Sequence, residues 1–425
     1  MIMNTKSAIT ILFVTLISSA CTTPQQAKQS PMQNQYSTIQ TESAKSASPA
    51  KKHKHRMPSQ VNGVISLDIV SKGGRLHLLT GTHNNGVKSL WYQYSDDQGN
   101  SWSKASHANA HTNQKIVMLR GNDAKLSVQG NTVVVVWTSF VKGNMHGAGP
   151  MMAARSNDLG KSWQTGATPS DWTEGSNAFL AMSSDEQKMH MVWLDSRFGK
   201  SAVKGSQGLR YAVSDDAGLS WSKNITLDNI TCACCWNTAK VADDGELFVL
   251  YRDKQPTDMA IGSLNKNQQW QRHSPVGDFK WDFPGCPHIG GGLAMIGQGD
   301  NMEMHSVVGT GHPDHLGVHY LYSADAGKNW QSPVQLGDYS AIHADIAAND
   351  QGRIVAVWDM RSEDNLTIFS AESNDKGKNW SKPKLISTPG YRATHPRIIN
   401  TAQGFLVLWT QVKQGQEQQL AMQHL

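Results

Sequence analysis

The residues best suited to chemistry are four cysteines in two short motifs. Cys232, Cys234 and Cys235 stand in the run Cys-Ala-Cys-Cys, and Cys286 stands in the run Gly-Cys-Pro-His. Thiolates are ligands of soft or borderline ions such as copper and zinc. Exported proteins also oxidise their cysteines, so two structural disulfides are the alternative to a metal site.

Three histidines share the position of Cys235 in the sequence units that follow it. Counted back from the aromatic residue of the next apolar run, His395 lies 14 residues upstream, His343 lies 15 and Cys235 lies 16. His288 takes the same place once a longer turn is allowed for. One such histidine alone is more often structural, whereas three in one register favour a shared centre.

We therefore predict a metal site with copper favoured over zinc, although these residues are too many to ligate one ion. Further candidate ligands from neighbouring loops are Met145, His146, Met151, Met152, His312 and His315. The predicted metal ligands are Cys232, Cys234, Cys235, Cys286, His288, His343 and His395.

The elements that must position these residues are repeats, marked by the pattern Ser-x-Asp-x-Gly-x-(Ser or Asn)-Trp. The Asp side chain can hydrogen-bond the backbone of a tight turn, Gly permits a positive φ, and Trp supplies an apolar anchor. Each copy is therefore predicted to be a hairpin turn whose Trp packs into the body of the fold. The copies span 95–102, 156–163, 214–221, 323–330 and 373–380.

Apolar runs typical of buried strands recur with the turns. They lie at 76–79, 133–137, 190–193, 247–251, 305–308, 354–358 and 406–409. The fourth unit carries a decayed turn at 263–270, in which Asn265 and Asn267 replace Asp and Gly. Units of roughly 45 to 60 residues suit four-stranded blades. The sequence therefore predicts an all-β propeller over 61–425 with seven four-stranded blades, or alternatively six, and a strand near 57–61 that completes the last blade.

The turns resemble the Asp-box (BNR-repeat) motifs of the sialidase superfamily, and the resemblance extends from about residue 60 to the end of the chain. It implies a propeller whose innermost strands line a central channel, so the predicted ligands should meet at the channel mouth. It also raises the prospect of an exo-sialidase or another glycoside hydrolase acting on an anionic glycan.

A sialidase-type site needs arginines for the substrate carboxylate, a tyrosine nucleophile and an acid that protonates the leaving group. The amino-terminal Arg-Ile-Pro motif of sialidases is absent, and Cys235 stands near the place of the carboxylate that assists the tyrosine. A propeller can also be a non-catalytic binding or assembly module of the cell envelope, so enzyme activity stays open. The candidate catalytic residues are Arg252, Tyr391, Arg397, Asp123 and Arg120.

The amino terminus has the features of an export signal. Lys6 precedes an apolar run at 8–20, which is too short to span a bilayer. Cys21 follows directly and resembles the lipidated cysteine of bacterial lipoproteins, with a soluble secreted protein cut near Ala20 as the alternative. We therefore expect a signal peptide at 1–20 and an outer-membrane lipoprotein that faces the periplasm or the cell surface.

Residues 21–60 are rich in Gln, Ser, Thr and Lys, which predicts a flexible tether. The net charge of +5 arises partly from this segment. The folded part carries no basic stripe interleaved with aromatic residues, which argues against nucleic acid as a partner. The expected partners are the membrane, through a lipid anchor, and an anionic small molecule or glycan.

Overall fold

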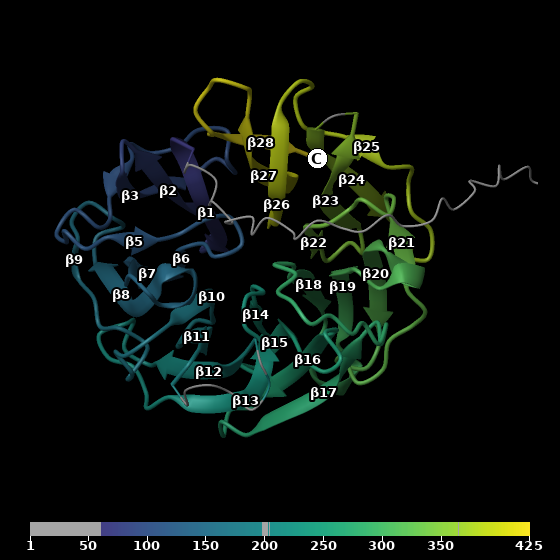
Figure 1. Cartoon of the computed structure of the whole chain (residues 1–425), viewed down its shortest axis with the longest axis horizontal. Coiled ribbons are helices and arrows are strands. Elements are labelled where there is room, and N and C mark those ends of the chain that lie inside the picture. The colour runs from purple at the N-terminus through teal and green to yellow at the C-terminus, as the bar shows by residue number, and fades with distance from the viewer. Residues whose placement is uncertain (1–60, 198–202, 204, 364) are drawn as a thin grey trace, which may run out of the picture. The chain divides into compact units, whose positions relative to one another are not determined.

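Seven small antiparallel sheets follow one another along the chain, each formed by consecutive strands. The computed structural model describes residues 61–197, 203, 205–363 and 365–425. The sheets form a seven-bladed β-propeller around a central channel (Figure 1). The predicted fold is confirmed, and the six-bladed alternative is wrong. Cys21 and the segments predicted as signal peptide and tether lie outside the described residues.

The strands of each blade are consecutive in sequence. Blades one and two contain β1 (Gly63–Lys72), β2 (Arg75–Asn84), β3 (Val87–Ser95), β4 (Ser106–His107), β5 (Ile116–Val117), β6 (Lys125–Gln129), β7 (Thr132–Phe140), β8 (Ala148–Ser156) and β9 (Gln164–Thr165). Blades three and four contain β10 (Asn177–Ser184), β11 (Met189–Asp195), β12 (Ser206–Ser214), β13 (Ile225–Cys232), β14 (Thr238–Val241), β15 (Leu247–Arg252), β16 (Met259–Leu264) and β17 (Trp270–Val276).

The later blades repeat this order, and three short 3-10 helices lie in the connections. Blades five to seven contain β18 (Gly291–Ile296), β19 (Glu303–Thr310), β20 (Gly317–Ser323), β21 (Val334–Leu336), β22 (Ala344–Ala348), β23 (Ile354–Ser362), β24 (Asn365–Ser373), β25 (Lys384–Leu385), β26 (Arg392–Thr401), β27 (Gly404–Val412) and β28 (Gln419–His424). The 3-10 helices are η1 (Met145–Gly147), η2 (Gly299–Asn301) and η3 (Pro313–His315). No helix among the described residues has the length and apolar character needed to span a membrane.

The first strand of each blade faces the channel, and the last lies on the perimeter, as β14 and β13 show in Figure 1. In blade two, β5 and β6 both pair with β7 and together supply the inner edge. The channel has a volume of about 400 Å³ and is lined by β1, β6, β10, β14, β18, β22 and β26. Side chains at the starts of these strands are therefore brought toward one another from different blades.

The five intact Asp boxes form the predicted turns. In the box of blade two, the Ser156 hydroxyl accepts from the Gly160 amide at 2.8 Å, and Asp158 accepts from the Ser162 amide at 2.9 Å. The glycine has a φ of +81°, and a Cβ there would lie 2.3 Å from Tyr92 in the preceding blade. The glycines of the other four boxes contact the preceding blade in the same way. The boxes therefore join neighbouring blades as well as turning the chain.

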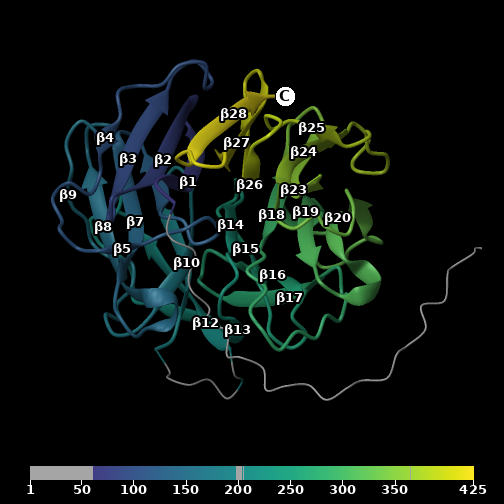
Figure 2. The ribbon, with the colours of Figure 1, turned by 45° about the horizontal axis from the view of Figure 1, so that its top comes forward.

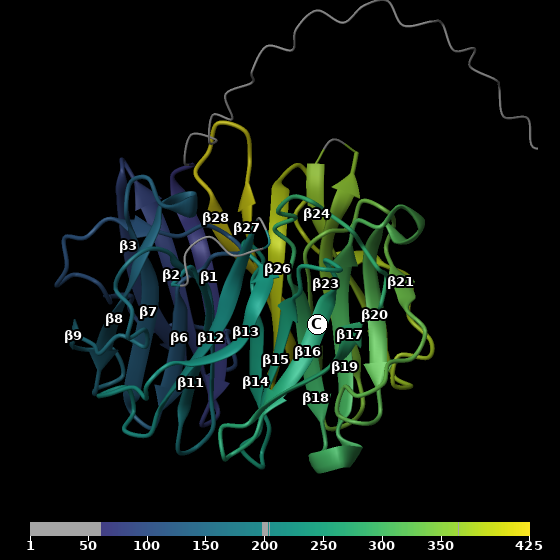
Figure 3. The same ribbon diagram turned by 60° about the horizontal axis from the view of Figure 1, so that its bottom comes forward.

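The apolar core lies between the blades. One cluster joins Val134 and Val136 of β7 to Trp193 of β11, and equivalent clusters join each successive pair of blades. A last cluster, which contains Leu67 and Leu406, joins blade seven to blade one and closes the ring. Figures 2 and 3 show β26 to β28 between β1 and β24. Burial of these side chains is the main favourable term in holding the ring together.

The last sheet has three strands, whereas four were predicted. The Val64 amide donates to the Gln418 carbonyl, and the Gln418 amide donates to the Asn62 carbonyl, each at 2.8 Å. The chain entering β1 thus pairs with the segment before β28. The predicted closing strand at 57–61 lies outside the described residues, except for Val61.

Three blades contain a buried histidine on the second strand that hydrogen-bonds a tyrosine on the third. The distances from Nδ1 to the hydroxyl oxygen are 2.7 Å for His77, 2.9 Å for His190 and 2.8 Å for His305. Burial lowers the pKa of His77 and of His305 to about 4. These imidazoles are therefore neutral in the folded protein at neutral pH.

We expect the propeller to lose stability as the pH falls below 6.5. As the pH falls, the imidazoles of His77 and His305 are protonated in the unfolded chain before they are protonated in the folded chain. The stability that depends on their neutral form is therefore fully present above pH 6.5 and is lost progressively down to about pH 4. Over this whole pH range, each of the two imidazoles accounts for a loss of about 3 kcal/mol in the free energy of unfolding. Thermal unfolding at pH 7.5 and pH 5 measures the effect.

The variant His305→Phe should show a smaller acid shift of its melting temperature than the wild type. The Tyr320 hydroxyl keeps a partner in this variant, because it also donates to the Lys376 carbonyl at 3.1 Å. His424→Phe, at the exposed end of β28, is the matched control and should behave as the wild type does. An equal acid shift in all three proteins would contradict this assignment.

Candidate metal centre

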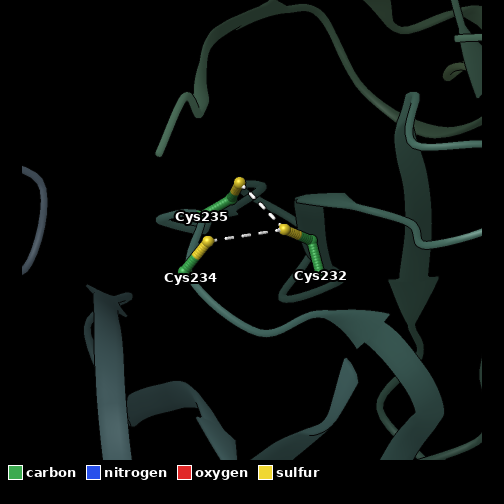
Figure 4. A group of neighbouring side chains, drawn as sticks. All are labelled: Cys232, Cys234 and Cys235. Carbon is green, nitrogen blue, oxygen red and sulfur yellow. Dashed lines mark hydrogen bonds between the residues drawn. The ribbon is translucent and has the colours of Figure 1, made fainter. Parts of the chain in front are cut away.

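Three cysteine thiols meet where the chain passes from blade three to blade four. Cys232 ends β13, and Cys234 and Cys235 lie in the turn that leads into β14. The Cys232 sulfur lies 3.1 Å from the Cys235 sulfur and 3.8 Å from the Cys234 sulfur. Figure 4 shows the three sulfurs pointing toward one another. Their sulfur atoms all lie within 4.8 Å of one another, so they can act as ligands to one ion.

Cys286 reaches the same cluster from the segment that links β17 to β18. It packs against the apolar core around the three thiols and interacts with Cys232 and Cys234. All four cysteines are free thiols. In a tetrahedral site with metal–sulfur distances of roughly 2.3 Å, neighbouring sulfurs lie roughly 3.8 Å apart. The spacing of Cys232 and Cys234 matches that value, whereas Cys232 and Cys235 are closer, at 3.1 Å. We call these four residues the thiol cluster.

Two buried cations act electrostatically on the thiol cluster. The Arg252 guanidinium donates to the carbonyls of Ile289, Thr257 and Gly309 at 2.7 to 2.9 Å, and only 2% of the residue is exposed. The Lys254 ammonium is equally buried and donates to the carbonyls of Phe283 and Gly285. Within the described part of the chain, neither cation forms an ion pair with a carboxylate.

The cations act electrostatically on individual thiols. Burial raises the pKa of Cys235 to about 12, and Arg252 opposes that shift. The interaction with Cys232 raises the pKa of Cys286 to about 11, and Lys254 opposes it. Arg252 also acts on the buried Asp258, whose oxygens accept from the Lys280 and Trp281 amides. Arg252 and Lys254 thus place positive charge near the thiol cluster, and Asp258 offsets part of it.

A second group that could hold a metal lies at the channel mouth. The rings of His343 and His395 stack with their centroids 3.6 Å apart. The His343 Nδ1 lies 2.7 Å from Asp359, whose carboxylate also accepts from the His395 amide at 2.9 Å. A carboxylate that orients an imidazole in this way is common beside metal-ligating histidines. One potential ligand atom from each of the three residues falls within 4.8 Å of the others.

The surroundings of this pair connect it with the thiol cluster. Trp236, directly after Cys235, lies 5.5 Å from the His343 ring and 5.7 Å from the His395 ring. Burial, together with His343 and Arg120, lowers the pKa of His395 well below its usual value. His395 Nδ1 is buried and has no hydrogen-bond partner among the described residues. The stacked pair is therefore poorly suited to carrying two positive charges.

His288 takes a different direction. Its ring contacts His146 of η1, with centroids 5.3 Å apart, and Phe179 of β10. The predicted ligands thus do not form one centre: they divide into the thiol cluster, the His343–Asp359–His395 group and the His146–His288 pair. The segments that carry the predicted ligands lie at one end of the channel, as their equivalent sequence positions predicted. Those positions did not predict the direction of each imidazole ring.

The remaining candidate ligands lie elsewhere. Met151 and Met152 pack in the core around β8. His312 and His315 lie at η3 and contact each other at 5.5 Å between ring centroids. The loop residue Met145 is exposed. None of these residues joins the two metal-competent groups found in the described part of the chain.

The predicted catalytic residues are only partly brought together. Arg252 is buried among carbonyl groups and does not line the mouth as predicted. Tyr391, in the turn before β26, lines neither the channel nor the small pocket beside His395. Arg397 lines both cavities, with its Nε 3.3 Å from Asp345.

Arg120 and Asp123 form a buried ion pair at 2.6 Å in the small pocket. Arg120 also donates to the His395 carbonyl at 2.6 Å, and Asp123 accepts from the Leu67 amide at 2.9 Å. Both side chains are therefore occupied in holding the loop before β6 against blades one and seven. Asp359 and Lys254 were not predicted. Asp359 directly follows the buried run 354–358, and Lys254 comes two residues after the end of β15, so a charged residue after a buried run is the signal that could have identified them.

Comparisons with known proteins identify the fold. A scan against models of protein families finds no match, and neither does a search among curated proteins. A polysaccharide lyase of family PL25, an ulvan lyase, is similar with a TM-score of 0.56 at 12% identity over 85% of this chain and 93% of that chain.

Sialidases are also among the similar structures. The K499G mutant of the NanB sialidase of Streptococcus pneumoniae has 12% identity and a TM-score of 0.44 over 85% of this chain and 67% of that chain. A leech intramolecular trans-sialidase has 11% identity and a TM-score of 0.46 over 85% and 68%. At 12% identity the likeness to the ulvan lyase concerns the fold alone.

Proposed function

We propose that this chain is an exported propeller that binds a soft metal ion through Cys232, Cys234, Cys235 and Cys286. The observation that carries the proposal is the pair of buried cations, Arg252 and Lys254, acting on the cluster of four free thiols. A buried charge without a compensating charge costs several kcal/mol. Neutral thiols cannot offset these cations, whereas metal-bound thiolates can.

The charge balance agrees with known types of thiolate site. A Cu(I) ion with two or three thiolates, or a Zn(II) ion with four, carries one or two negative charges. This matches the positive charge of Arg252 and Lys254 after the contribution of Asp258. We favour copper because the three close thiols stand on one short turn, which suits the low coordination number of Cu(I). The metal would hold the crossing segments of blades three to five together.

Metal analysis with thiol titration tests this function. Protein purified under reducing conditions should contain about one bound copper or zinc ion per chain, and its four thiols should react only after the metal is removed. Elemental analysis and a thiol reagent added with and without a chelator provide the two readouts. A metal-free protein with no reactive thiols after denaturation would identify disulfides and refute the proposal.

We also propose that Cys21 is lipidated and that residues 21–60 tether the propeller to the outer membrane. The export signal and the polar composition of the segment support this proposal. Mass spectrometry of the mature amino terminus would show an acylated Cys21. An unmodified amino terminus near Ala20 would indicate a soluble secreted protein instead.

A second proposed function is the recognition of an anionic glycan at the channel mouth. The basic side chains of Lys125, Lys240 and Arg397 in the channel favour it. The similar ulvan lyase is described in complex with an oligosaccharide of glucuronic acid and sulfated rhamnose. Because Arg252 is buried, a sialidase-type carboxylate clamp centred on it is not part of this proposal. Binding of an acidic oligosaccharide to the full chain, measured calorimetrically, tests the function.

A further inference from the structure

The channel is large enough for a small ligand and is lined by all seven blades. Its volume of about 400 Å³ falls in the range typical of sites for small molecules. The lining combines charged groups with hydroxyl groups, among them Ser71, Ser127, Ser183 and Ser184. Such a lining suits a hydrophilic, charged ligand.

The charges in the channel do not cancel. Lys125 pairs with Asp68 at 3.0 Å, and Arg397 pairs with Asp345 at 3.3 Å. Lys72, at the end of β1, pairs with Glu186 at 2.6 Å. Among the described residues that line the channel, Lys240 is the cation without an ion pair, so one positive charge remains.

Lys240 projects from β14 into the channel. Its neighbours on the strand, Ala239 and Val241, point toward the blade interior, where they pack with the apolar cluster between blades three and four. Lys240 is exposed in the open channel, and the charged groups that act on it are Asp345, Arg397 and Asp68, all from other blades. Ser71 also lines the channel and is exposed, so its hydroxyl is accessible to a ligand.

We propose that the channel binds a small hydroxylated carboxylate, of the kind formed by a sugar acid, with its carboxylate on Lys240. One carboxylate balances the remaining positive charge, and the hydroxyl groups of the ligand find partners such as Ser71. This inference rests on the second proposed function and identifies the group that recognises the acid. It does not depend on the thiol cluster.

Calorimetry with D-glucuronate as the probe, and D-glucose as the neutral control, tests the inference on the full chain. Lys240→Met removes the charge and should weaken glucuronate binding by about tenfold or more, as expected for a lost charged hydrogen bond. Lys240→Arg retains the charge and should retain most of the affinity. Circular dichroism at matched temperature would verify that both variants are folded.

A second readout uses the native protein. An amine-acetylating reagent followed by peptide mass spectrometry should modify Lys240, and glucuronate should protect it whereas glucose should not. Equal glucuronate affinity in wild type and Lys240→Met, or no protection of Lys240, would overturn the inference. An acidic oligosaccharide that still binds the Met variant would leave the second function standing. Conversely, protection of Lys240 without any oligosaccharide binding would support the channel site and refute glycan recognition.

Discussion

Replacing Cys232 with serine is expected to abolish metal binding by the propeller. Cys232 lies at the centre of the thiol cluster, because its sulfur contacts those of Cys234 and Cys235 and interacts with Cys286. Loss of a partner that only orients a ligand already costs roughly 10- to 100-fold in metal affinity. Loss of a central ligand should therefore cost at least about 100-fold. Competition with a chelator of known affinity measures the change.

The matched control is Cys21→Ser, which makes the same substitution outside the thiol cluster. In protein produced without lipidation, this variant should bind the metal as tightly as the wild type. The Cys232→Ser variant should also melt at a lower temperature than the wild type when metal is present, and at a similar temperature after metal removal, because the metal stabilises only the folded state. Unchanged metal affinity in Cys232→Ser would contradict the proposed ligand set.

Replacing Arg252 with methionine should destabilise the propeller by about 3 to 5 kcal/mol and weaken metal binding. The variant leaves the carbonyls of Ile289, Thr257 and Gly309 without their donor. It also removes a positive charge that offsets the thiolates. Urea unfolding with and without metal measures both effects, since the stabilisation by metal should shrink.

Arg272→Met is the matched control for this prediction. Arg272 belongs to the same blade, is 42% exposed at its side chain and pairs with Asp253, which is 17% exposed, at 2.9 Å. Because the guanidinium is exposed, this pair is worth about 1 kcal/mol, so stability and metal affinity should change less than in Arg252→Met. Equal effects of the two substitutions, or a wild-type metal affinity in Arg252→Met, would show that Arg252 does not serve the thiol cluster.

The repeated turns made the fold predictable from the sequence. The spacing of Ser, Asp, Gly and Trp in each Asp box dictates a local turn, and the glycine contacts to the preceding blade follow from the same pattern. Closure of the ring was harder to predict. The pairing of Asn62 and Val64 with Gln418 joins residues that are far apart in sequence and carry no motif.

The site was predictable only to the level of segments. His343 and His395 hold equivalent positions in the sequence, and their rings are in contact as predicted. His288 holds the equivalent position in its own blade, but its ring lies beside His146. The direction of a side-chain ring depends on the local backbone. Both His288 and His395 adopt a positive φ, which no sequence pattern predicts. The burial of Arg252 follows from strand alternation, since it shares a face of β15 with Phe248 and Leu250, which pack against blade five.

The central claim is that the sulfur atoms of the thiol cluster surround one metal ion. X-ray absorption at the edge of the bound copper or zinc measures this environment directly. A first shell made only of sulfur, at roughly 2.3 Å, is the result that the thiol cluster predicts. A first shell dominated by nitrogen or oxygen would place the ion at the imidazoles of the channel mouth or elsewhere, and would contradict the account.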